Sequence, residues 1–455
     1  MNNPTIQPST SCLNILGLVL VLILWPVMLF GQSQDDRSTT DIWRDTLRFG
    51  IDTSVTAIIG EMQTARNTEL IPELREIFPG ARRAVQTQII EFFQAMESPE
   101  LVPEIIEEML FFQDLHPSLV QLMIRYLQAF PPDQEPDLDQ VMTEIATGTN
   151  PELSSAAIRF LGARQNVESY DFFMDLYEKD GQPIQVRLAA LEALGNFPNQ
   201  EVVDFLEDLA EDSSLDQLLR QSSIRALGNI GNSQSLALFR RLLDTDDPFL
   251  RTTVLQSLDS FETREITGLY RSALRDSFWR VRLSVLQALA RNPIPELESQ
   301  VIFIARNDPE VPVRTQGYRT LRAYDSNQAW QVIEADAFNT RISESFRLLL
   351  LEMVVQDRFR QNRDRLVEII DQEWAKENSR LLDVIGRNLS TLNESQALPI
   401  FERFLGHREL VIRIYGIRGI GNSAGSQFRD QIEALTQDGN PPVIRQNARA
   451  ALERL

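Results

Sequence analysis

A pattern of apolar and polar positions recurs at a nearly constant spacing along most of this chain. It is clearest in seven segments that begin with an aliphatic residue followed by arginine: VRLAALEALG (186–195), LRQSSIRALG (219–228), LRTTVLQSLD (250–259), VRLSVLQALA (281–290), VRTQGYRTLR (313–322), IRIYGIRGIG (412–421) and IRQNARAALE (444–453). The first five segments follow one another directly, and so do the last two. A fixed period within the range known for helical repeats predicts an array of similar structural units.

Each unit is predicted to contain two helices. In one of them, EVVDFLEDLAE (201–211) forms the first helix and LLRQSSIRALGNI (218–230) the second, with Gly231 directly after it, where a glycine commonly ends a helix. With the repeated arginine as position 0, positions −1, +4 and +7 are aliphatic in nearly every unit, and +3 and +6 are mostly small. Small residues at +6, such as Ala193, Ala226 and Ala288, would let neighbouring helices approach closely. Because one unit cannot bury this stripe alone, the units must stack. We therefore expect an all-α fold, a right-handed α-solenoid of stacked two-helix repeats, over residues 42–455.

The repeated arginine lies within the buried arc of the second helix. A buried cation needs a partner, and most units carry an acid a few residues before the arginine. The sequence therefore predicts a structural Asp–Arg ladder between repeats. Its arginines are Arg187, Arg220, Arg251, Arg282, Arg314, Arg413 and Arg445, and its acids include Asp246, Asp276 and Asp308. The unit of Arg413 departs from this pattern, because it offers Glu409 and no aspartate.

The combination of an acidic loop with V-R-x-x-A-L-x-A-L-G resembles the HEAT-repeat superfamily, and most closely the short repeats named after phycobilisome lyases. The resemblance covers nearly all of residues 42–455. It implies a helical solenoid that serves as a scaffold or adaptor, since only a few HEAT arrays are enzymes. A fold alone does not fix a function, however, and a lyase-like or chaperone-like activity remains an alternative.

Position +5 of the second helix faces away from the apolar arc and is expected to be exposed. It holds long polar side chains in six units: Glu192, Arg225, Gln256, Gln287, Arg319 and Arg418. The resemblance to HEAT proteins implies that the second helices line the concave surface, so these residues would form a polar strip along a groove. They are either solubilising surface or a contact strip for an extended peptide or an acidic partner.

The amino-terminal segment, residues 1–31, predicts export. Residues 15–30 are apolar throughout, a length that fits the hydrophobic region of a signal peptide better than a membrane span. We expect a signal peptide over 1–31, a polar linker over 32–41, and a location in the periplasm or outer cell envelope. An uncleaved amino-terminal membrane anchor is the alternative, because residues 1–10 lack Lys and Arg and Leu29 stands three residues before the expected cleavage site.

The amino-acid composition disfavours several classes of ligand and cofactor. A net charge of −21 disfavours binding to nucleic acid or to anionic lipid. The only cysteine is Cys12, and the only histidines, His116 and His407, lie far apart in the sequence, so no metal site or cofactor is expected.

Two features invite a catalytic interpretation. Residues 421–425 match the nucleophile motif G-x-S-x-G, but that motif needs a strand before its turn, and here it follows a repeat helix. His407 lies near a predicted loop without an identifiable partner. We therefore expect no enzyme but an exported, acidic HEAT-repeat scaffold that binds protein in the cell envelope. The alternative is a structural envelope protein held by an uncleaved amino-terminal helix.

The sequence gives no single interpretation for two sets of residues. Residues 323–400 follow the repeat poorly, and SFRLLLLEMVV (345–355) is either a tighter inner core or a contact patch. The aromatic residues Phe249, Phe278, Trp279 and Tyr318 recur near the turn into the second helix and are expected to cover the end of the core, with Trp279 as the candidate for exposure.

Overall fold

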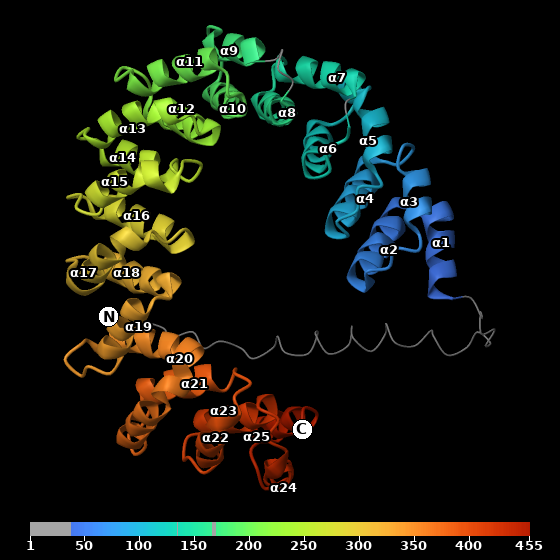
Figure 1. Cartoon of the computed structure of the whole chain (residues 1–455). Coiled ribbons are helices and arrows are strands. Elements are labelled where there is room, and N and C mark those ends of the chain that lie inside the picture. The colour runs from blue at the N-terminus through green and yellow to red at the C-terminus, as the bar shows by residue number, and fades with distance from the viewer. Residues whose placement is uncertain (1–37, 134, 166–169) are drawn as a thin grey trace, which may run out of the picture. The chain divides into compact units, whose positions relative to one another are not determined.

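The computed structural model describes residues 38–133, 135–165 and 170–455, and every regular element in these ranges is a helix (Figure 1). The chain divides into two compact units, residues 1–145 and 146–455. The predicted signal peptide lies outside the described residues. The first helix begins at Thr39, within the stretch predicted as a linker.

The first unit contains three helix pairs and one further helix. Its helices are α1 (Thr39–Phe49), α2 (Asp52–Ala65), α3 (Ile71–Ile77), α4 (Arg83–Ala95), α5 (Val102–Met109), η1 (Phe112–Asp114), α6 (Pro117–Ala129) and α7 (Pro136–Ala146). Helix α2 packs against α4, and α4 against α6. Phe78, Phe92, Phe93 and Tyr126 are fully buried between them. This unit therefore has a core of its own, built by stacking neighbouring pairs.

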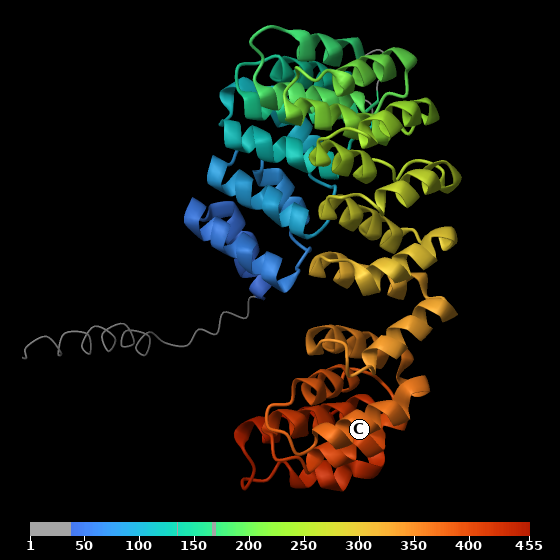
Figure 2. The same cartoon turned by 90° about the vertical axis from the view of Figure 1, so that its left-hand side faces the viewer.

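The second unit continues the same plan. Its helices up to the irregular stretch are α8 (Pro151–Ala163), α9 (Tyr170–Glu178), α10 (Ile184–Leu194), α11 (Gln200–Glu211), α12 (Gln217–Ile230), η3 (Ser233–Ser235), α13 (Leu236–Leu243), α14 (Pro248–Gln256), α15 (Thr263–Ala273), α16 (Trp279–Arg291), η4 (Pro295–Leu297), α17 (Glu298–Asn307), α18 (Val311–Tyr324) and α19 (Asn327–Ala337). Figure 2 shows the helix pairs from α11 to α18 as successive layers. The predicted all-α solenoid of two-helix repeats is confirmed.

The rest of the unit consists of α20 (Glu344–Glu373), α21 (Arg380–Leu389), η5 (Ser395–Ala397), α22 (Leu398–Leu405), α23 (Leu410–Asn422), η6 (Ser426–Phe428), α24 (Arg429–Ala434) and α25 (Pro442–Leu452). The 30 residues of α20 are two helices joined without a loop, with non-helical torsion angles at Arg358 (φ −134°, ψ 28°). The second helix of one repeat thus runs directly into the first helix of the next. This fusion explains why residues 323–400 follow the repeat poorly.

Small residues let neighbouring second helices approach closely. Gly162 faces Ala193, Gly195 faces Ala226, and Gly228 faces Ser257. A Cβ atom on Gly228 would lie 2.5 Å from the Cβ of Ser257, too close for any side chain to fit without a shift. The predicted role of the small positions is confirmed.

No helix among the described residues is long and apolar enough to cross a membrane.

Candidate partner-binding surface

The six residues at position +5 are all exposed. Glu192, Arg225, Gln256, Gln287 and Arg319 lie on α10, α12, α14, α16 and α18, and Arg418 lies on α23. Figure 1 shows the second helices α10, α12, α14, α16 and α18 along the inner side of the second unit, with the first helices of the same pairs outside. The predicted exposure is confirmed, and we call these six residues the polar strip.

A hollow of about 550 Å³ opens along the polar strip. Glu192, Arg225 and Gln256 line it from three successive second helices, together with Asp259. Its floor includes small residues, among them Ser222, Ala226 and Gly228, which leave room between the longer side chains. The hollow therefore crosses helices rather than lying within one repeat, which suits an extended ligand better than a compact one.

Some residues of the polar strip have partners within the protein and others do not. Glu192 binds Arg159 (Arg159 Nε to Oε2, 2.7 Å), and Arg418 Nε donates to Asn447 Oδ1 at 2.9 Å. Among the described residues, no hydrogen bond or ion pair engages the guanidinium groups of Arg225 and Arg319. Two cations are thus available to acidic or carbonyl groups of a partner.

The predicted Asp–Arg ladder forms two complete rungs. Arg251 Nε and Nη2 donate to Asp276 at 2.8 and 2.9 Å, and Arg282 donates to Asp308 through the same atoms at 2.7 Å each. These hydrogen bonds raise the pKa of both arginines above the ordinary value. Each arginine also donates Nη1 to the carbonyl of a residue six positions earlier, Thr245 or Asp276. Each rung therefore joins one repeat to the next, and the buried cations are fully paired.

The remaining predicted members of the ladder are not rungs between repeats, which corrects the prediction. Asp246 is exposed, and Arg251 binds Asp276 instead of it. Arg220 donates to the carbonyl of Ala210, and Arg314 donates to the carbonyls of Asp308 and Pro309.

The other three arginines also differ from the prediction. Arg187 lies over the ring of Tyr177, and Arg445 binds Asp438 within its own repeat. Among the described residues, the Nε atoms of Arg187 and Arg413 have no hydrogen-bond partner. As whole residues these three arginines are half-buried, which lowers the need for the carboxylate that position 0 was expected to have, but the Nε atoms of Arg187 and Arg413 are themselves buried.

A second set of ion pairs joins the first helices of successive repeats, and sequence reasoning missed it. Its members are Arg44–Glu73, Arg75–Glu104, Arg241–Glu211, Arg306–Asp336 and Arg403–Asp371. The signal is a charged residue whose opposite lies 29 to 32 residues away, close to the repeat period. The repeated apolar pattern lies on the second helices, so it did not predict these ion pairs between first helices.

The two catalytic-looking features are structural. Ser423 is buried at the end of α23, where its hydroxyl accepts from the amide of Glu394 at 3.1 Å and contacts the carbonyl of Leu392 at 3.3 Å. His407 is buried edge-on against Trp374, its Nε2 3.1 Å from the carbonyl of Trp374. Both polar groups are therefore engaged by the backbone, as the loop interpretation of the G-x-S-x-G string predicts.

Residues 345–355, which the sequence assigns either to an inner core or to a contact patch, are partly buried. Leu350, Leu351, Met353, Val354 and Val355 are buried. Leu348 and Leu349 are half-buried and line a hollow of about 360 Å³ with residues of α21. The inner-core interpretation therefore holds for five of the eight apolar residues of this segment, all of them between residues 350 and 355.

The aromatic residues near the turns behave differently from one another. Tyr318 is buried, and Phe278 and Trp279 are half-buried. Phe249, which was expected to cover the core, is 48% exposed.

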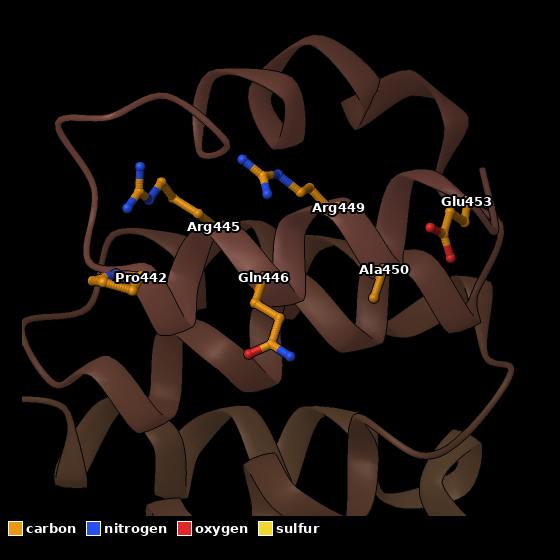
Figure 3. Close-up of a pocket in the computed structure, with 6 residues that line it drawn as sticks. All are labelled: Pro442, Arg445, Gln446, Arg449, Ala450 and Glu453. Carbon is orange, nitrogen blue, oxygen red and sulfur yellow. The ribbon is translucent and has the colours of Figure 1, made fainter. Parts of the chain in front are cut away.

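The end of the second unit carries a shallow hollow on α25 alone (Figure 3). Arg445 and Arg449 point to one side of this helix and Gln446 to another. One helix face cannot enclose a ligand, so this hollow is a weaker candidate than the one along the polar strip. Among the described residues, no three His, Cys, Asp or Glu side chains are placed to hold a metal ion.

Comparison with curated proteins and solved structures gives only distant similarities. No curated protein matches it. Among solved structures, Kap121p is 11% identical with a TM-score of 0.44 over 90% of this chain and 53% of its own, so the chain spans about half the length of that karyopherin. Kap95p is 11% identical, with a TM-score of 0.48 over 92% and 60%. The CpcE–CpcF phycocyanin lyase from Nostoc sp. PCC7120 is 17% identical, with a TM-score of 0.31 over 53% and 96%.

A protein-family model provides the decisive match. The family described as Spirochaete HEAT repeat protein matches residues 47–451, which is nearly all of the described chain. The match agrees with the stacked helix pairs and with the repeat period of the sequence. The chain therefore belongs to the spirochaete HEAT repeat protein family.

Proposed function

We propose that this protein is an exported, non-enzymatic scaffold that binds a protein partner in the cell envelope through the polar strip. The observation that carries the proposal is the exposure of all six strip residues at one position of successive second helices. An array that offers equivalent contacts at regular intervals suits a ligand that runs along it. The hollow across α10, α12 and α14 gives such a ligand a place to lie.

The unengaged guanidinium groups of Arg225 and Arg319 favour a partner with carboxylate or carbonyl groups at intervals along its chain. An extended peptide supplies backbone carbonyls in this way, and acidic side chains would strengthen the contact. The engagement of Ser423 and His407 by the backbone supports a binding role over catalysis.

Export rests on residues 15–30. Their apolar run supports secretion with cleavage after Gly31, or retention of the segment as an anchor. Amino-terminal sequencing of the protein recovered from cells separates the two, because a start at residue 32 means a free scaffold and an intact amino terminus means an anchored one. Recovery of the protein in the cytoplasmic fraction would contradict both.

In-cell photo-crosslinking tests the strip itself. A photoreactive amino acid at Asn229, which lines the hollow, avoids amine reagents that would reach only Lys179 and Lys376. The test variant combines Arg225→Glu, Gln256→Glu, Gln287→Glu and Arg319→Glu. We expect a defined envelope protein to crosslink to the wild type and to be lost from the variant.

The matched control carries the same four changes on the opposite side of the helix pairs. Arg240→Glu, Arg271→Glu, Gln234→Glu and Gln361→Glu alter exposed residues outside the second helices and shift the net charge equally. The control variant should keep the partner. If the wild type and the strip variant recover the same amount of crosslinked partner, the polar strip is solvent-exposed surface and not the binding site.

A further inference from the structure

Exposed large apolar side chains in the second unit are concentrated at one place in the repeat. Eight are exposed among the described residues of 146–455, which leave out 166–169, and seven of these occupy the first or second residue of a second helix: Ile184, Leu218, Phe249, Val311, Leu410, Val411 and Val443. Trp279, the first residue of α16, is half-buried. The eighth exposed residue, Phe303, lies on the first helix α17. Chance placement would not confine these residues to the same turn of each repeat.

The exposed residues are not needed for the core. The neighbouring residues Leu219, Leu250, Val281 and Val313 fill the interior and are at most 3% exposed. Leu218, Phe249 and Val311, by contrast, are 53, 48 and 54% exposed. Phe249 continues into Phe278 and Trp279 through ring contacts at 6.1 and 6.4 Å. We call Ile184, Leu218, Phe249, Trp279 and Val311 the apolar edge. The apolar edge is thus a row of apolar side chains at the same turn of successive repeats, with rings in contact at its centre, and exposed apolar clusters of this kind mark sites of interaction.

The loops beside the apolar edge are acidic. Five loops, residues 179–183, 212–216, 244–247, 274–278 and 308–310, lead into α10, α12, α14, α16 and α18. Apart from the ladder acids Asp276 and Asp308, they hold seven carboxylates: Asp180, Asp212, Asp216, Asp244, Asp246, Asp247 and Glu310. Their only cations are Lys179 and Arg275. The exposed Arg280 lies over the ring of Trp279 and adds one more cation, so a ligand that covers the apolar side chains still comes close to a surplus of exposed negative charge.

We propose that the apolar edge docks a basic polypeptide segment in extended conformation, with an apolar side chain at about every third residue. Packed helices lie about 8–10 Å apart, and an extended chain advances about 3.3 Å per residue, so every third side chain can reach a successive repeat. Lysine or arginine at the positions between would meet the loop carboxylates. Charge complementarity thus selects a basic segment over an acidic one.

This surface is separate from the polar strip and extends the proposed function. Leu218 and Arg225 lie seven residues apart on α12, which is about 10 Å along the helix axis. The apolar edge and the polar strip therefore occupy different ends of the same second helices. Each can be altered without removing the other.

Fluorescence anisotropy with the purified full-length chain tests the proposal. The probe is a labelled fifteen-residue peptide in which Leu-Arg-Ser is repeated five times, and the comparison peptides replace Arg by Glu or Leu by Ser. We expect the first peptide to bind and both comparison peptides to bind at least tenfold more weakly. The variant Leu218→Ser, Phe249→Ser, Val311→Ser should also lose at least tenfold in affinity. High salt should weaken binding of the first peptide to the wild type, because the loop carboxylates contribute.

Two controls keep the outcome interpretable. Phe303→Ser removes an apolar side chain that is 65% exposed on a first helix and should leave binding unchanged. The strip variant with Arg225→Glu should also retain the peptide, which separates failure of this proposal from failure of the strip. Equal binding by wild type and triple variant, absence of binding, or equal binding of the Glu peptide would overturn the proposal. So would self-association of the chain that the triple variant abolishes while peptide binding stays the same.

Discussion

The second unit joins its repeats in two different ways. From α14 to α18 separate helices are linked by acidic loops, and the buried arginine of one repeat holds the aspartate of the next, as in Arg282–Asp308. The next loop that leads into a second helix, residues 338–343 between α19 and α20, contains no carboxylate, and Arg314 lies over the ring of Phe346 at 5.0 Å instead. Beyond it, α20 runs through the following junction without a loop.

The contrast shows that a repeat junction needs hydrogen-bond partners for its backbone and a partner for its buried arginine. Different kinds of groups can supply these partners. In the first region loops and aspartates do both. At the kink of α20, the amide of Asn362 donates to Glu334 at 2.9 Å and to the carbonyl of Arg358 at 3.2 Å. Arg358 itself binds Asp325 and lies over the ring of Trp330. Different residues thus meet the same requirements.

The largest effect is expected where the first region depends on one aspartate. Asp308→Ala leaves Arg282, which is 8% exposed, without its carboxylate, and should destabilise this junction by about 3–5 kcal/mol. Hydrogen exchange in α16 and α18, with urea unfolding, measures the loss. Asp246→Ala is the matched control and should change stability by less than about 0.5 kcal/mol. Equal losses in the two variants would show that the rung contributes nothing beyond surface charge.

The kink of the fused helix should be the next most sensitive site. Asn362→Ala removes both hydrogen bonds of a buried amide and should cost about 1–3 kcal/mol. Urea unfolding measures the loss, and hydrogen exchange in α19 and α20 assigns it to this region. The neighbouring change Gln361→Ala, at an exposed position, should have little effect. If Asn362→Ala is equally harmless, the kink needs no side-chain support.

A smaller effect is expected at the border between the two regions. A double-mutant cycle with Arg314→Gln and Phe346→Leu should give a coupling of about 0.5–1 kcal/mol, because the ring replaces the missing carboxylate. Thermal unfolding of the four proteins measures it. Additive effects within error would mean that the two backbone carbonyls bound by Arg314 suffice.

The smallest effect is a dependence on alkaline pH. Burial raises the pKa of Tyr324 to about 12, and its hydroxyl donates to the carbonyl of Ile294 at 2.7 Å. The folded protein thus holds this proton more tightly than the unfolded chain, so stability that is present below about pH 10 is lost as pH rises toward 12. With partial exposure, the loss should be about 1 kcal/mol or less. Tyr324→Phe should remove only this part of the loss of stability between pH 9 and 12, because Tyr126, Tyr270, Tyr318 and Tyr415 also have raised pKa values, and an unchanged profile would contradict this assignment.

The period of the sequence was enough to predict the helix pairs, the close approach at small residues and the exposure of the polar strip. These features depend on spacing along single helices, which the sequence displays directly. The partner of each buried arginine depends instead on how the next loop folds, so Asp246 was included and only two rungs were found. The sequence does contain an indication of the fused helix, because residues 345–373 include neither glycine nor proline, the residues that commonly end a helix. The exposure of Phe249 could not be predicted, because it depends on which residue of the first turn faces outward.

The two rungs also have a mechanical consequence. Repeats stacked in a row carry a stretching force in series, so the weakest junction opens first and sets how far the array extends at a given load. The junctions closed by Arg251–Asp276 and Arg282–Asp308 should resist such a load longest. Junctions without a rung, such as that of Arg187, would lengthen earlier and act as the compliant part of a spring under tension.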